Sequence, residues 1–125
     1  MTTLTSPIGR IEERIKKQQA DLFKQGTLEL LILRLLSSSS LNGWDIMQRI
    51  QLVSGEVLSV TAGALYPALH RLEARGLISA VWRPSENNRR AKFYGLTARG
   101  RKHLETQRKQ WEQFSDAVAL ILRDA

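Results

Sequence analysis

Apolar residues recur along this 125-residue chain mostly at the spacing of a helical face. Near the start, five apolar positions between residues 8 and 23 follow at intervals of three, four, seven and one, and charged residues fill the gaps. This pattern predicts an amphipathic helix with a narrow apolar stripe, which includes Ile8, Ile11 and Ile15. Gly26 and Thr27 interrupt it, and we expect Thr27 to cap the helix that follows.

Two shorter helices are predicted next, over about 28–36 and 44–53. In the first, leucine and isoleucine repeat at i, i+3, i+4, i+7 and i+8 from Leu28, and four serines and Asn42–Gly43 end the pattern. In the second, Ile46, Met47 and Ile50 share one face, and Ser54–Gly55 close it. Both patterns are typical of helices that bury one side.

A fourth helix is predicted within "TAGALYPALHRLEARGLI", residues 61–78. Thr61 can cap it, leucines 65, 69 and 72 form its buried stripe, and Gly76 suits a left-handed residue at its end. Pro67 lies inside this pattern, and its ring crowds the preceding turn of a helix. We therefore expect regular helix to begin late, after a loose or 3₁₀ first turn.

The β-branched and aromatic runs "LISAVWR" and "RAKFYGL", joined by "PSENNR", predict an antiparallel hairpin. Alternation along its second strand places Arg90, Lys92 and Tyr94 on one face, and we expect Phe93 and Leu96 to face the core. Thr97 then caps a last helix over about 98–122, whose apolar residues from Trp111 to Ile121 have heptad-like spacing.

The order of three short helices, a hairpin and a long helix predicts a winged helix-turn-helix. The expected fold class is therefore mainly α with a β-hairpin wing, flanked by N- and C-terminal dimerisation helices. We divide the chain into an N-terminal helical extension (1–25), a winged helix-turn-helix DNA-binding domain (26–97) and a C-terminal dimerisation helix (98–125). Trp44 and Trp82 are expected in the core or at its edge.

The distribution of charge along the chain indicates more about its partners than the overall composition does. The formal net charge is +7, and residues 71–102 alone hold 9 basic and 2 acidic residues. Such a local excess suits a polyanion such as nucleic acid, although a solvated basic surface is the simpler alternative. The chain has no cysteine, no apolar run long enough for a membrane span and no catalytic motif. We therefore expect a cytoplasmic protein that is not an enzyme and has no cofactor or metal.

The candidate DNA contacts lie on the fourth helix and the hairpin. Small residues at the helix start allow close approach to the major groove but offer few hydrogen bonds to bases. Long cationic and amide side chains at the hairpin suit phosphates. The candidates are Thr61, Ala62, Gly63, Ala64, Tyr66, His70, Arg71, Asn88, Arg89, Arg90 and Lys92. Tyr66 could instead be a core residue, and His70 and Arg71 could be merely solvated.

The segment "LYPALHRLEARGLI", residues 65–78, closely resembles the signature of the PadR family of bacterial transcriptional regulators. Residues 26–50 and 89–104 are similar to the family's first helices and to its wing and last helix. The resemblance implies a homodimer, usually a repressor, that binds a palindromic operator. It also implies the short subgroup, in which last helices pair and some members bind flat aromatic compounds against a tryptophan; Trp111 stands at a comparable place.

Dimerisation is also expected from the residues themselves, because the two terminal helices have stripes too narrow to be buried by one small domain. The candidate dimer or effector residues are Trp111, Phe114, Val118, Ile121, Leu122, Ile8, Ile11 and Ile15. The expected partners are double-stranded DNA, a second copy of the chain and a small hydrophobic or aromatic effector, with no membrane. The alternative is a winged-helix module that binds RNA or a protein.

Overall fold

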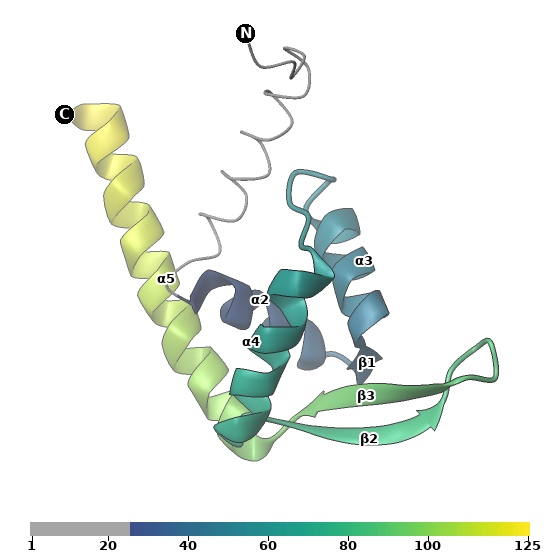
Figure 1. Cartoon of the computed structure of the whole chain (residues 1–125). Helices are drawn as coiled ribbons and strands as arrows, with labels where there is room; N and C mark the ends of the chain where they lie inside the picture. Colours follow the sequence, from purple (N-terminus) through teal and green to yellow (C-terminus); the bar gives the residue numbers. More distant parts are fainter. Residues whose placement is uncertain (1–25) are drawn as a thin grey trace, which may run out of the picture.

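The computed structural model describes residues 26–125, so the predicted helix with Ile8, Ile11 and Ile15 lies outside the described residues. The described part contains four helices and a three-stranded antiparallel sheet (Figure 1). Its elements are α2 (Thr27–Leu36), β1 (Leu41–Asn42), α3 (Gly43–Val53), α4 (Ala62–Ala74), β2 (Ile78–Pro84), β3 (Arg90–Leu96) and α5 (Ala98–Asp124). The mainly helical fold with a hairpin wing is confirmed.

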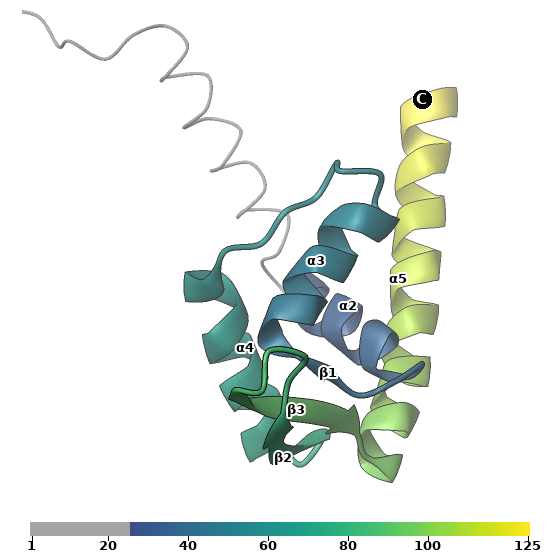
Figure 2. The same cartoon turned by 90° about the vertical axis from the view of Figure 1, so that its right-hand side faces the viewer.

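The core lies where α2, α3 and α4 meet the sheet, and the two views show α5 along one side of this bundle (Figure 2). The predicted stripe of α4 is fully buried, because Leu65, Leu69 and Leu72 have no exposed surface. Ile32 of α2 and Ile46 of α3 are also fully buried. Burying large aliphatic side chains in this way supplies most of the stability of such a domain.

Side chains close the first turns of three helices. Asn42 Oδ1 accepts from the Asp45 amide at 2.8 Å, Thr61 Oγ1 from Ala64 at 3.2 Å, and Thr97 Oγ1 from Gly100 at 3.0 Å. The caps predicted at Thr61 and Thr97 are therefore confirmed, whereas Asn42, expected to end a helix, begins the next one.

The cap predicted at Thr27 is wrong. Thr27 is the first helical residue of α2, and Gly26 occupies the cap position with a φ of 87°. That left-handed conformation favours glycine, so the chain enters α2 by a backbone turn and not through a hydroxyl cap.

The expectation about Pro67 is also wrong. The α4 helix begins at Ala62, directly after its Thr61 cap, and includes Pro67. A proline there removes the hydrogen bond to the carbonyl of Gly63, four residues earlier, and crowds that carbonyl. The buried leucine stripe and the cap outweigh this local penalty. The first two turns of α4 are therefore regular helix.

The sheet has the order β1–β3–β2, and the short β1 was not predicted. Leu41 and Asn42 pair with Tyr94 and Phe93, which ties the start of α3 to the wing. Tyr94 is 2% exposed, and burial raises the pKa of its hydroxyl above the ordinary value. The prediction for Phe93 is wrong, since it lies on the opposite face of β3, only partly buried, with the Arg83 guanidinium 4.0 Å over its ring.

The long α5 has two different halves. Its start packs on the domain, where Gly100 and Leu104 are buried. Its C-terminal half extends beyond α2, α3 and α4 in both views (Figures 1 and 2). Within residues 26–125, no helix has the length and apolar character needed to cross a bilayer.

Candidate nucleic-acid interface

The outer face of α4 is open and nearly free of charge at its start. Residues 61–64 are exposed, and the first turn has no acidic side chain. One turn further, His70 is exposed and Tyr66 is 40% exposed. The Tyr66 ring rests against α3, since a Cβ on Gly43 would lie 2.5 Å from the Tyr66 hydroxyl. Tyr66 is therefore neither a core residue nor fully free.

The wing ends in a turn that the backbone defines. The Ser85 amide donates to the Arg89 carbonyl at 2.7 Å, and the Asn88 amide donates to the Ser85 carbonyl at 3.0 Å. Asn88 has a φ of 59°, a left-handed conformation that asparagine tolerates better than most residues. Asn88 thus shapes the turn, and Arg89 and Arg90 are exposed beside it.

A groove of about 800 Å³ lies between the wing, the start of α3 and the middle of α4. We call it the wing groove. Its lining includes six residues of the predicted or adjoining set, namely Tyr66, His70, Asn87, Arg89, Arg90 and Lys92. The structure therefore brings together side chains from α4, from the turn of the wing and from β3. Thr61, Ala62, Gly63, Ala64, Arg71 and Asn88 do not line it.

Two predicted phosphate ligands are already engaged within the protein. Lys92 Nζ lies 3.2 Å from Glu73 Oε1, which links the wing to α4. Arg71 Nε lies 3.0 Å from Glu29 Oε1, and this pair joins α4 to α2. Both pairs are partly exposed, so each contributes little to stability. They nevertheless direct these cations toward neighbouring helices, whereas Arg89 forms no ion pair with another residue of the described part of the chain and is exposed on the wing.

Trp44 and Trp82 also line the wing groove. The expectation that they could lie in the core is therefore wrong. Trp44 is 64% exposed in the first turn of α3, and Trp82 is 58% exposed on β2, an edge strand. The Arg90 guanidinium lies 5.6 Å from the Trp82 ring. The sequence did hold a signal for the exposure of Trp82. It lies near the turn, beyond the part of the hairpin that can reach the core.

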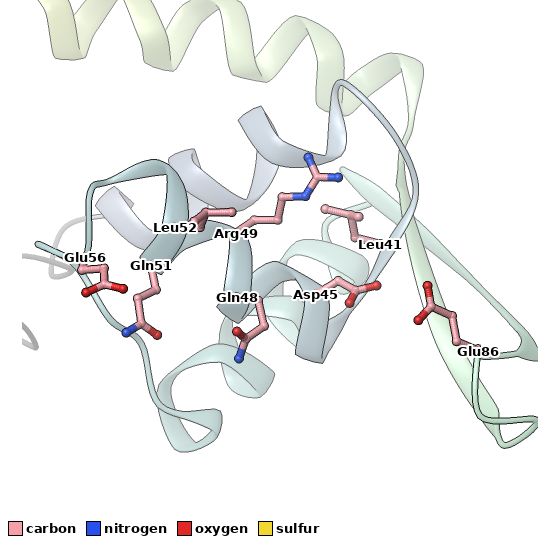
Figure 3. Close-up of a pocket in the computed structure, with 8 residues that line it drawn as sticks. All are labelled: Leu41, Asp45, Gln48, Arg49, Gln51, Leu52, Glu56 and Glu86. Carbon is pink, nitrogen blue, oxygen red and sulfur yellow. The ribbon is translucent and has the colours of Figure 1, made fainter.

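A second hollow lies along α3 and shares Asp45 and Glu86 with the wing groove, but its lining is more acidic. Figure 3 shows Glu86 on the wing and the remaining lining residues on or beside α3. Its lining holds three carboxylates, of Asp45, Glu56 and Glu86, and one cation, Arg49, whereas the wing groove is lined by two carboxylates and three cations. The excess of carboxylates in the second hollow repels phosphates. The wing groove is therefore the better candidate for a polyanion.

The distal half of α5 forms a separate candidate surface. Trp111 and Phe114 are exposed, with ring centroids 6.1 Å apart. Ile121 and Leu122 are exposed too, and Val118 is half-buried. A small hollow of about 180 Å³ lies at the base of this surface, where Trp111 and Phe114 meet Gly26 and Leu30.

Between residues 26 and 125, no group of three histidine or acidic side chains lies close enough together to hold a metal ion.

Comparison with known proteins gives these surfaces a context. Residues 32–106 match the model of the transcriptional regulator PadR-like family. The transcriptional regulator Rv3488 of Mycobacterium tuberculosis is 31% identical over 96 residues, which cover 77% of this chain and 86% of that protein. The transcriptional regulator YqjI of Escherichia coli is 29% identical over 96 residues, but the match covers only 44% of its length.

Solved structures agree in fold. A PadR-like transcriptional regulator from Bacillus cereus superposes with a TM-score of 0.70 at 26% identity, over 81% of this chain and 96% of that one. The similarity therefore extends over about four fifths of this chain and nearly all of the other.

Proposed function

The chain belongs to the PadR-like family of transcriptional regulators, and on this premise we propose that it is a homodimeric repressor that binds a palindromic operator. In this proposal α4 enters the major groove and the wing lies along the phosphate backbone. Residues 26–97 form the DNA-binding domain, residues 98–125 form the dimerisation helix, and residues 1–25 form the N-terminal extension. The protein acts by binding and not by catalysis.

The observation that carries the DNA-binding role is the position of the cationic wing beside the open face of α4. The exposed α4 start is small and uncharged, and Arg89 and Arg90 line the wing groove together with Tyr66 and His70 of the same helix. Sequence-independent affinity for duplex DNA comes mainly from such contacts with phosphates. The small residues 61–64 allow close approach, so base contacts are few and shape contributes to specificity.

The apolar face of α5 supports the homodimer. A helix of 27 residues is about 40 Å long, and most residues of its distal half are exposed. Leu122 is 81% exposed and Phe114 is 62% exposed. Continuous exposed apolar surface of this kind is typical of an interface between chains. Pairing through α5, together with the stripe of Ile8, Ile11 and Ile15, would bury it.

Release by a small hydrophobic or aromatic effector is the last part of the proposal. The hollow beside Trp111 is about 180 Å³ in one protomer, which is less than the ~300 Å³ of a small-molecule site. A second protomer would enlarge and enclose it. An effector there would alter how the two α5 helices pair, and hence the separation of the two α4 helices.

The test compares two DNA duplexes of equal length, one from the region upstream of this protein's own gene and one with the same bases scrambled. Binding is measured at two salt concentrations. We expect the upstream duplex to bind more tightly by about 1,000-fold or more, with affinity falling steeply as salt rises. Equal affinity for both duplexes would contradict an operator-binding repressor and favour a winged-helix module for RNA or for a protein partner.

A further inference from the structure

We infer that Trp44 and Trp82 hold one strand of the duplex backbone in the wing groove by packing against its deoxyribose rings. This inference rests on the proposed function and adds a non-ionic contact to it. It assigns a role to two side chains that the fold does not need for its core, because both are more than half exposed.

The two indoles belong to different elements but to one surface. Trp44 stands on the first turn of α3, and Trp82 stands on β2 opposite Lys92 of β3. Both line the wing groove, together with Arg89, Arg90 and Lys92. An exposed indole is a large apolar surface, and two of them in one groove require an explanation that a single exposed residue does not.

The chemistry of the wing groove matches a sugar–phosphate strand. Such a strand alternates an anionic phosphate with a largely apolar sugar. The wing groove likewise combines three cations, which outnumber the carboxylates of Asp45 and Glu86 there, with two indoles. An indole can pack on a sugar and donate one N–H to a phosphate oxygen. The Arg90 guanidinium lies 5.6 Å over the Trp82 ring. It covers one face of that ring, so Trp82 is less suited to stacking between unpaired bases.

The contact also compensates for a weakness of α4. Its first turn presents Ala62, Gly63 and Ala64, which offer no side-chain hydrogen bonds to base edges. Arg71 and Lys92 are held by carboxylates of the same chain. Packing of the two indoles against sugars supplies affinity that does not depend on base hydrogen bonds or on free cations.

The decisive experiment separates ionic from non-ionic contacts by their response to salt. Full-length wild type, Trp44→Ala, Trp82→Ala and Arg89→Ala are titrated with the upstream duplex over a range of salt concentrations. Each tryptophan variant should bind about tenfold more weakly at every salt concentration, with the same slope of log affinity against log salt. Arg89→Ala should instead reduce the slope by about one.

Leu52→Ala is the matched control, because Leu52 is 74% exposed on the same helix as Trp44 but does not line the wing groove. It should bind as the wild type does. Tryptophan variants that bind within twofold of wild type would overturn the inference, and so would a slope that falls as it does for Arg89→Ala. Tighter binding of a single strand of the same sequence than of the duplex would also overturn it.

A second readout uses the wild-type chain labelled with 5-fluorotryptophan. Saturation with duplex should shift the fluorine resonances of Trp44 and Trp82 and reduce their exposure to solvent, whereas unchanged resonances for both would overturn the inference. If wild type shows no preference for the upstream duplex but both resonances still shift, the operator proposal fails alone. If wild type binds no DNA, the proposed function and this inference fail together.

Discussion

At the scale of single residues, two glycines show how differently the same residue type can be constrained. Gly100 is buried at the start of α5, and a Cβ there would collide with the carbonyl oxygen of Leu77. Gly63 is exposed on α4, and its nearest neighbour to such a Cβ is Thr61 Oγ1 at 3.8 Å. Only the first position requires the absence of a side chain.

Substitution by alanine should therefore have opposite effects at these two positions. Gly100→Ala should lower the free energy of unfolding by about 2 kcal/mol or more, because backbone atoms must move. Gly63→Ala should raise it by about 0.5–1 kcal/mol, since alanine is the better helix former. Urea denaturation followed by circular dichroism measures both, and a stable Gly100→Ala variant would contradict the packing described for α5.

Sequence patterns predict residues well where one local cause dominates. The caps at Thr61 and Thr97 and the buried stripe of Leu65, Leu69 and Leu72 follow from hydroxyl chemistry and helical period. The ion pairs of Lys92 and Arg71 were not predictable, because each depends on a carboxylate brought near by folding. The same holds for Phe93, whose side of β3 is set by the pairing of β3 with β1 and β2.

At the scale of elements, the wing supplies the cations on which the proposed phosphate contacts depend. Replacing Arg89 and Arg90 with alanine should weaken binding to all DNA sequences alike and reduce the salt slope by about one for each lost phosphate contact. Arg108→Ala is the control, because Arg108 lies on α5 beside Glu112, away from the wing. Titrations at several salt concentrations measure the slope, and an unchanged slope would remove the wing from phosphate binding.

The elements themselves were largely predictable, with two instructive exceptions. The start of α4 was wrongly expected to be irregular, because the local penalty of Pro67 was given more weight than the Thr61 cap and the buried leucines. The two-residue β1 was not expected, since a strand that short has no period and exists only through its pairing with β3. In both cases tertiary packing decided what local preference could not.

At the scale of the whole molecule, the apolar face of α5 should control assembly. Trp111→Asp places a charge in that face and should shift the protein from dimer toward monomer, because burying an unpaired carboxylate is unfavourable. Leu52→Asp is the control, since Leu52 is also an exposed apolar residue but lies on α3. Sedimentation velocity distinguishes the two states, and an intact Trp111→Asp dimer would place the interface elsewhere.

In the proposed dimer, the way the two chains pair also determines how the two α4 helices meet DNA. A dimer through α5 would hold two α4 helices at a fixed separation, and two half-sites one helical turn apart require about 34 Å. One α4 helix with its wing offers few base contacts, so useful affinity depends on the second. The arrangement also explains why a ligand beside Trp111 could act on DNA binding from a distance.

The most direct measurement is the affinity of the protein for its footprinted operator and for a duplex that retains only one half-site, with the mass of each complex determined by sedimentation. The account predicts two protomers on the full operator and a loss of about 100-fold or more for the half-site. A single protomer that binds both duplexes equally tightly would contradict it.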